Sequence, residues 1–254
     1  MQIEKGGRVK LYTAIAGILI FIFLGCAREA IKPDLTVDEL FSKSMEEFNK
    51  KKYNLAIDGF KRLVFQHPGS ELIDKAQFYL AESYLNSKDY DDAIVEYRFL
   101  IENFPESPFL DDASYKIGLC YYLASPPYYL DQNKTEAALK VLNSFIKHFP
   151  ESEWIEKAQE IKQKCLDKLS KKELETGKLY YKLGHFKSAE IYLNNLLDVY
   201  PTSSYVDESK YTLALCYEKQ GRVDEAKVLL TELMDGKGKF SIQAKKRLKY
   251  LTTR

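Results

Sequence analysis

The sequence predicts an all-α fold, a solenoid of five helical hairpins followed by a C-terminal capping helix. The first observation is a set of five alanines with the same surroundings, Ala56, Ala93, Ala138, Ala189 and Ala226. In four of the five units a small residue stands twelve positions before the alanine, and in four a proline stands twelve positions after it. In every unit a large apolar residue follows the alanine by four positions, which is one helical turn along the same face.

Each part of this unit has a physical role in a helical hairpin. Two antiparallel helices approach closely only where small side chains meet, and pairs such as Ser44/Ala56, Ala81/Ala93 and Gly177/Ala189 supply them. The proline ends each second helix because its ring cannot continue a helix. The serines that follow are predicted to cap the next helix. These serines are Ser70, Ser107, Ser152 and Ser203 or Ser204.

The repeat resembles the tetratricopeptide repeat, lengthened from the usual ~34 residues to about 37. Hairpins of this kind cannot bury their apolar faces alone, so stacking of neighbours must supply the core. In the last unit Gly238 stands where the other four have the proline.

Two stretches depart from the regular spacing. In the third unit the small residue, Gly118, lies twenty positions before the alanine, and the inserted segment 124–132 contains Pro126 and Pro127. Prolines next to aromatic residues predict a rigid extended loop here. Between the third and fourth units, residues 153–172 are rich in Lys, Glu and Gln, with apolar residues at helical spacing. A single helix of about 30 residues is predicted there, from Glu153 to Leu183.

The N-terminus has the features of an export signal. Three basic residues fall within residues 1–10, and the uncharged apolar stretch 11–24 is too short for easy membrane spanning. It ends in Phe23-Leu24-Gly25-Cys26, which resembles the lipobox of bacterial lipoproteins. The resemblance implies cleavage after Gly25, acylation of Cys26 and, because Ala27 follows, delivery to the periplasmic face of the outer membrane. The alternative is an uncleaved signal anchor with an incidental cysteine.

The two departures, together with the lipobox, carry a more specific resemblance. The stretch Leu130-Asp131-Gln132 through Phe149-Pro150-Glu151-Ser152, then residues 168–173 and 180–184, resembles the BamD family of outer-membrane assembly lipoproteins. That family combines five repeats, a lipidated cysteine, a loop in the third repeat and a long helix entering the fourth.

The BamD resemblance implies a scaffold of the β-barrel assembly machinery and no enzyme. Its implied partners are the periplasmic domains of a BamA-like insertase, unfolded outer-membrane proteins and the membrane through the lipid anchor. The implied division is a signal peptide (1–25), a lipidated linker (26–36), a substrate-binding half (37–152) and an insertase-docking half (153–254). Two alternatives remain open: a repeat adaptor of another envelope system such as Tol-Pal, and a ligand binder that serves a transporter.

A stripe of large residues on the first helices is the candidate peptide-binding site. Residues three positions before each small residue are Phe41, Phe78, Tyr115, Leu174 and Tyr211, and Phe48 and Tyr122 extend the stripe. In tetratricopeptide architecture the first helices line the concave face, and rigid rings suit an unfolded β-strand segment with a terminal aromatic residue. The alternative is that these rings pack hairpin against hairpin.

Charge and residue chemistry argue against several other functions. The chain carries 38 basic and 37 acidic residues, and residues 26–254 carry 35 and 36, so the whole chain lacks the charge that nucleic-acid binding requires. The three histidines show no metal-ligand spacing, and we expect neither a metal nor a cofactor. Cys120, Cys165 and Cys216 are predicted to be small core residues, with a disulfide as the alternative. The acid-free segment after Asp235 predicts a capping helix, with a solvated face or one that meets an acidic partner or anionic lipid.

Overall fold

The computed structural model describes residues 35–236 and 238–253 of the chain. The predicted signal peptide, Cys26 and nearly all of the predicted linker lie outside the described residues. The described residues form eleven helices that follow one another as hairpins, which confirms the all-α prediction. In chain order they are α2 (Val37–Asn49), α3 (Tyr53–Gln66), α4 (Ile73–Ser87), α5 (Tyr90–Asn103), α6 (Leu110–Ala124), α7 (Asn133–His148), α8 (Ile155–Lys182), α9 (Phe186–Val199), α10 (Val206–Lys219), α11 (Val223–Met234) and α12 (Lys239–Thr252).

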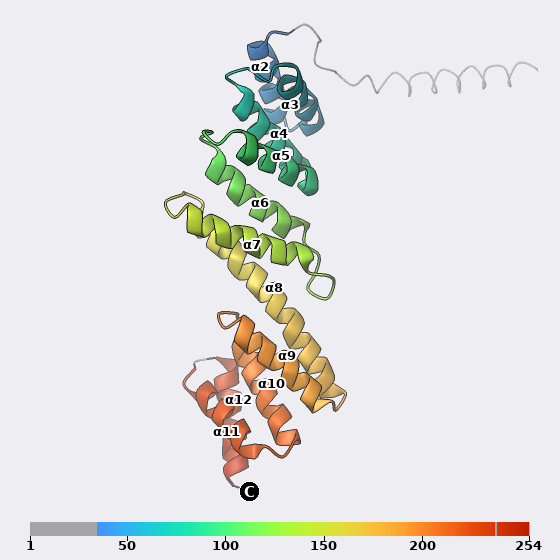
Figure 1. The fold of residues 1–254 in the computed structure, drawn as a ribbon. Helices are drawn as coiled ribbons and strands as arrows, with labels where there is room; N and C mark the ends of the chain where they lie inside the picture. The colour runs from blue at the N-terminus through green and yellow to red at the C-terminus, as the bar shows by residue number, and fades with distance from the viewer. Residues whose placement is uncertain (1–34, 237, 254) are drawn as a thin grey trace, which may run out of the picture.

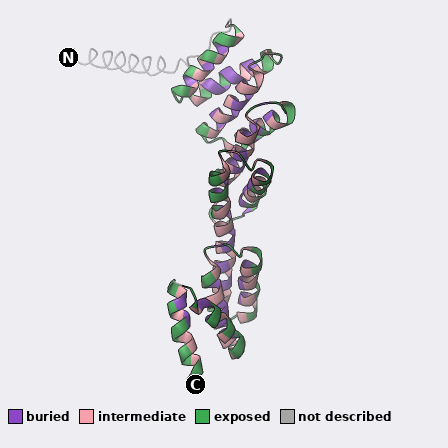
Figure 2. Ribbon diagram, turned by 90° about the vertical axis from the view of Figure 1, so that its left-hand side faces the viewer, coloured by how far each residue is buried: buried purple, intermediate pink, exposed green. Residues whose placement is uncertain are grey.

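The hairpins stack in chain order into an elongated molecule, with α2 at one end and α11 and α12 at the other (Figure 1). Each helix packs on the helix before it and the helix after it. Buried residues therefore lie between the stacked helices, and the outward faces are exposed (Figure 2). The key alanines are fully buried in all five units, as the predicted close approach requires.

Two of the predicted small residues are glycines for a steric reason. A Cβ atom on Gly118 would lie 2.7 Å from Cδ2 of Leu142, and one on Gly177 would lie 2.8 Å from Cγ of Leu193. Both leucines are fully buried, so neither has free space into which it could move. These two crossings therefore leave no room for any side chain.

The long helix predicted for residues 153–183 is α8, Ile155–Lys182. Its first half packs against α7 through Ala158, Ile161 and Cys165. Its second half packs against α9, where Leu174 shares an apolar cluster with Leu193. One helix thus serves two hairpins at different points along its length, and the two halves of the molecule are offset along it (Figure 1).

The second helices end just before the prolines, as predicted, but the serines do not cap the next helices. Helices α3, α5, α7 and α9 each end two residues before a proline. The N-cap of each following helix is the residue two positions after the serine, as Leu72 is after Ser70. The side chain of this N-cap residue makes no capping hydrogen bond. The serine Oγ instead accepts a hydrogen bond from that residue's N–H, 3.1 Å for Ser70 and Leu72. The chain makes a tight turn at the serine first, so the helix starts later than the sequence pattern suggests.

Four of the turns within hairpins share one backbone geometry. The residue five positions before the key alanine has a positive φ: 59° at Lys51, 72° at Lys88, 80° at Gly184 and 78° at Gly221. Its N–H donates to the carbonyl three residues earlier, and the next N–H donates to the carbonyl five residues earlier. This is the left-handed end of a helix that usually carries glycine. The first two hairpins carry lysine there.

Candidate functional site

The residues of the predicted aromatic stripe fall into two structural groups. Phe41 and Phe48 on α2 are half-buried. Both meet the ring of Tyr79 on α4 edge-on, with centroids 6.3 Å and 5.6 Å away. The ring of Phe41 also lies 5.8 Å from that of Phe60, and the Lys75 ammonium lies 5.3 Å from the Phe41 ring centre. The end of the solenoid near α2 therefore carries a cluster of rings that remain partly open to solvent.

Phe78 and Tyr115 are instead buried between neighbouring hairpins, with 8% and 4% of their surfaces exposed. Phe78 stacks on Phe109, with centroids 4.5 Å apart and planes inclined by 14°. Tyr115 stacks in the same way on Trp154, at 4.9 Å and 8°. Phe109 and Trp154 are the N-cap residues of α6 and α8, so each first helix is covered by the start of the next first helix.

The remaining stripe positions follow no single pattern. Leu174 is fully buried, and Tyr211 packs against Phe240 of α12 with centroids 5.9 Å apart. Tyr122, at the end of α6, is half-buried, and the Lys168 ammonium of α8 lies 5.0 Å from the centre of its ring. The structure thus brings Phe41 and Phe48 together and leaves Tyr122 reachable near the loop.

The inserted loop of the third hairpin is fastened to α8 by three lysines. Lys168 Nζ donates to Ser125 Oγ at 2.5 Å, and Lys172 Nζ donates to the Leu130 carbonyl at 3.1 Å. The Lys171 ammonium lies 4.6 Å from the centre of the Tyr128 ring. Burial lowers the pKa of Lys168 below its ordinary value. The lysine-rich stretch of α8 therefore has a structural role where it meets the loop.

Inside the loop, Gln132 supplies the hydrogen bonds that the irregular backbone lacks. Its side chain is buried, and its Nε2 donates to the carbonyls of Pro127 and Leu130 at 2.8 and 3.2 Å. Thr135 Oγ1 donates to Gln132 Oε1 at 2.7 Å. This internal bonding agrees with the rigid loop expected from its prolines. Tyr129 is 67% exposed at the surface of the loop.

A charged network that the sequence analysis missed lies between the second and third hairpins. Tyr97 donates a hydrogen bond to Glu82, and Lys116 Nζ lies 3.0 Å from Glu82 Oε1. The same ammonium lies 5.5 Å from the centre of the Trp154 ring, and Trp154 Nε1 donates to Asp112 at 2.8 Å. Burial is the main reason that the pKa values of Tyr97 and Asp112 are raised. Glu82 and Lys116 stand next to core positions on their helices, but only the stacking of hairpins pairs them.

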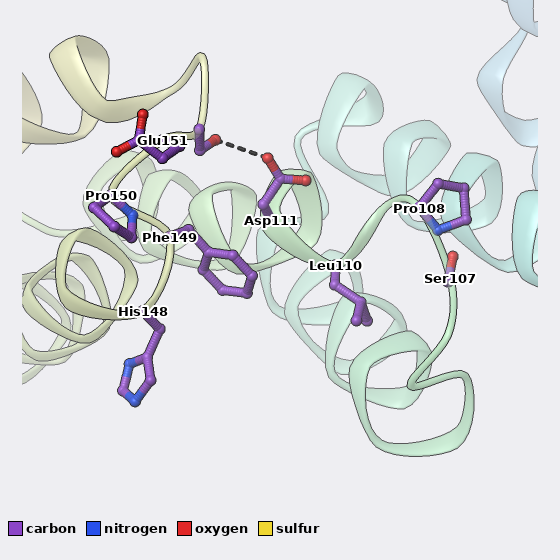
Figure 3. Close-up of a pocket in the computed structure, with 9 residues that line it drawn as sticks. Ser107, Pro108, Leu110, Asp111, His148, Phe149, Pro150 and Glu151 are labelled. Carbon is purple, nitrogen blue, oxygen red and sulfur yellow. Dashed lines mark hydrogen bonds between the residues drawn. The ribbon is translucent and has the colours of Figure 1, made fainter.

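A shallow groove lies between the turn that precedes α6 and the turn that precedes α8 (Figure 3). Leu110 and Phe149 supply apolar surface, and Asp111 and Glu151 supply negative charge. The Ser152 hydroxyl donates to Asp111 at 2.8 Å and ties the two turns together. The corresponding bond one hairpin earlier joins Ser107 to Asp74 at 2.8 Å. The hydrogen bond that ties the turns together at this groove therefore recurs one hairpin earlier.

Cys120, Cys165 and Cys216 are buried free thiols. In residues 35–236 and 238–253 no group of His, Cys, Asp or Glu side chains is placed to hold a metal ion. Among the helices of the same ranges, none has both the length and the apolar character needed to cross a bilayer.

Comparison with known proteins decides the family. The profile of the YfiO family, described as outer membrane lipoprotein, matches residues 33–227. The chain belongs to the YfiO family. YfiO membership makes this an outer-membrane lipoprotein by family, and it confirms the family resemblance seen in the sequence.

Relatives of this YfiO protein are named outer membrane protein assembly factor BamD. The relative from Caulobacter vibrioides is 27% identical over 219 residues, which are 84% of this chain and 72% of the relative. The relative from Rickettsia prowazekii is 25% identical over 224 residues, which are 86% of this chain and 89% of the relative. These names describe assembly factors and not enzymes, in agreement with the prediction that the chain is no enzyme.

Solved tetratricopeptide proteins are distant structural neighbours of this YfiO protein. The TPR2AB domain of yeast Sti1, solved with pHSP90, is 11% identical, with 78% of this chain and 76% of that chain covered and a TM-score of 0.47. A thermophilic TPR protein of Thermus thermophilus is 18% identical, with 86% and 100% covered and a TM-score of 0.36. The family assignment does not depend on either.

Proposed function

We propose that the chain is a lipid-anchored adaptor of outer-membrane β-barrel assembly, which docks on a BamA-like insertase and receives unfolded barrel proteins. The family profile over residues 33–227 is the observation that carries this proposal. The relatives named BamD support the assembly role, and the stacked hairpins supply the extended surface that adaptors of this architecture use.

The anchor in this proposal is Cys26, exposed as the mature N-terminus and acylated. Several acyl chains on one cysteine hold a protein at a bilayer, whereas one chain binds only marginally. Mass spectrometry of the mature protein tests this, because the expected N-terminal peptide begins at an acylated Cys26. An unmodified Cys26 thiol in the envelope protein would contradict the anchor.

The adaptor role is tested by affinity purification from detergent-solubilised envelopes. We expect the insertase to be recovered with the chain. Recovery of Tol-Pal components or of a transporter in its place would replace the proposal with one of the two alternative adaptor functions. Deleting residues 153–254 cannot separate the two proposed halves, because α8 carries core positions of both.

For substrate binding we propose that Phe41 and Phe48, with Tyr122, receive an extended segment that ends in an aromatic residue. Partial exposure of these rings supports this role, since a ring must be reachable before binding and covered afterwards. Phe78 and Tyr115, which we also predicted for this site, are enclosed by Phe109 and Trp154. We therefore assign their rings to holding the hairpins together, and the proposed site is narrower than the predicted stripe.

The experiment uses Phe41→Ala with Phe48→Ala and a peptide that ends in an aromatic residue. Loss of two contact rings should weaken binding at least about tenfold. The matched control is Phe65→Ala on α3, because this ring is 78% exposed and lies outside the proposed site. Circular dichroism checks that the helices remain. Equal affinity of the double variant and the control would remove the binding site from the proposal.

A further inference from the structure

The turn between α2 and α3 places three lysines side by side at the end of the solenoid nearest the proposed anchor. Lys50, Lys51 and Lys52 are all exposed. The first turn of α3 contains no acidic residue, whereas α5 and α11 each begin with two. The turn of the first hairpin thus lacks the pair of carboxylates that follows the turns before α5 and α11.

The backbone at Lys51 costs free energy that a glycine would avoid. Its φ of 59° is the left-handed conformation, and the equivalent positions of the fourth and fifth hairpins are Gly184 and Gly221. Non-glycine residues held in strained backbone conformations cluster at functional sites. Lys88 has the same conformation, but Asp89, Asp91 and Asp92 surround it, so its charge is compensated locally. Lys51 makes no ion pair within the part of the chain that the structure describes.

The lysines beside Lys51 also neutralise a buried carboxylate. Glu47 is 4% exposed and stands where four other hairpins have a tyrosine, such as Tyr84. The Nζ atoms of Lys43, Lys50 and Lys52 lie 3.5, 3.8 and 3.6 Å from its oxygens.

Counting the neighbouring charges leaves the turn positive. Glu46 pairs with Lys43 at 3.0 Å and with Lys50 at 2.5 Å. Lys50 and Lys52 are therefore both engaged with carboxylates, and the charge left over in the turn is that of Lys51. Within the part of the chain that the structure describes, no carboxylate forms an ion pair with Lys51 to offset its charge.

The position of the turn in the chain points to its occupant. Cys26 precedes Thr36 by ten residues, a reach of at most about 35 Å for an extended chain. Acylation of Cys26 would therefore confine the first hairpin close to the bilayer. A basic patch that is already held near a membrane needs little affinity of its own to bind it. Lysines near an anionic membrane surface each contribute attraction, and one lipid anchor combined with a basic patch is a general way to bind a bilayer.

We propose that the α2–α3 turn, through Lys50, Lys51 and Lys52, rests on the anionic phospholipid headgroups of the membrane to which the chain is tethered. This inference rests on the proposed anchoring at Cys26. The contact fixes which edge of the first hairpin faces the bilayer, so that the aromatic cluster of Phe41 and Phe48 keeps a set orientation relative to the membrane.

The test attaches the chain to vesicles chemically, so that it does not depend on acylation in cells. Residues 26–254 are made without lipid and coupled through Cys26 to a maleimide lipid. The other three thiols are buried, and every residue of the four apolar clusters lies at or after Leu35. The coupled chain therefore keeps the whole described core.

The readout is the acetylation rate of each lysine by acetic anhydride, followed by peptide mass spectrometry. On phosphatidylglycerol vesicles Lys51 should react about fivefold more slowly than on phosphatidylcholine vesicles. Lys245, Lys246 and Lys249 on α12, all at the far end of the solenoid, are the internal control and should keep their rates. In 1 M salt the protection should disappear, because charge interactions are then screened within about 3 Å.

A charge variant separates the turn from the rest of the chain. Lys50→Gln with Lys52→Gln should reduce the protection of Lys51, whereas Lys245→Gln with Lys246→Gln should not. Equal acetylation of Lys51 on both kinds of vesicle, or protection of the α12 lysines in its place, would overturn the inference. A failed anchor would be detected separately, as an unmodified Cys26 in the envelope protein.

Discussion

The indole of Trp154 lies flat on the phenol ring of Tyr115, with centroids 4.9 Å apart and planes inclined by 8°. Trp154 also donates from Nε1 to Asp112 at 2.8 Å, so the N-terminus of α8 is fastened to α6 by a ring and a hydrogen bond together. Because α8 is the helix shared by both halves of the molecule, this contact fixes the direction in which the second half leaves the first.

Replacing Tyr115 should therefore destabilise the whole fold. Tyr115→Ala removes a ring from a residue that is only 4% exposed and should lower the free energy of unfolding by roughly 3 kcal/mol, the scale of large-to-small changes in cores. The measurement is urea unfolding followed by the fluorescence of Trp154, the sole tryptophan. Tyr129→Ala, at a ring 67% exposed, is the control and should change stability by less than about 0.5 kcal/mol. If Tyr115→Ala lowered the free energy of unfolding no more than Tyr129→Ala does, the packing role of Tyr115 would be contradicted.

The two glycine crossings should resist even a methyl group. A helical Gly→Ala change normally gains about 1 kcal/mol, but overpacking of a closed core costs about 1–3 kcal/mol. Gly118→Ala and Gly177→Ala should therefore lose up to about 2 kcal/mol in denaturant unfolding. Gly69→Ala, where no atom lies within 4 Å, should not show this loss. A stabilised Gly177→Ala protein would mean that the helices can separate at that crossing.

These two positions also show what the sequence could predict. Spacing of small residues located the crossings, and a continuous apolar period without proline located α8 to within two residues at its start and one at its end. The small-residue spacing and the apolar period are both local patterns, because residues close together in the sequence determine where a helix runs and where it meets the next helix. The fold was therefore predictable from the sequence.

The candidate site was predictable only in part, because exposure depends on contacts between distant residues. Phe41 and Phe78 occupy the same position of their hairpins, yet Phe78 is covered by Phe109 and Phe41 has no such ring over it among the described contacts. Tyr79, one residue after Phe78, falls off the stripe and nevertheless joins the open cluster. Helical spacing identifies the face of a helix, but the next hairpin decides whether that face is closed.

Exchanging lysine and glycine between equivalent turns should change stability in opposite directions. Lys51→Gly relieves a left-handed residue and should stabilise the fold by about 0.5–1 kcal/mol, after the greater entropy of glycine in the unfolded chain is subtracted. Gly221→Lys introduces the same strain and should destabilise by a similar amount. Thermal unfolding of both variants measures this. Shifts of the same sign would show that the turn tolerates lysine without strain.

The three cysteines should stay unreactive in the folded protein. Burial raises the pKa of the Cys120 and Cys216 thiols to about 12 and that of Cys165 to about 11. An ordinary thiol ionises near pH 8.5, and the thiolate is the reactive form. At pH 8 a thiol reagent should therefore label none of the three before unfolding and all three in denaturant. Rapid labelling of native Cys165 would show that α8 opens where the two halves join.

The raised pKa values of the three thiols also make the stability of the fold depend on pH. The folded state holds these three protons more tightly than the unfolded chain does, so its free energy of unfolding must fall as pH rises above the ordinary thiol value of about 8.5 and through 11–12. Below pH 8 the thiols are protonated in both states and the contribution is fully present. Cys120→Ala with Cys216→Ala removes two of these protons and should flatten the alkaline part of the stability curve relative to the unsubstituted chain. A curve with unchanged slope between pH 9 and 11 would mean that other groups, such as the tyrosines, dominate alkaline unfolding.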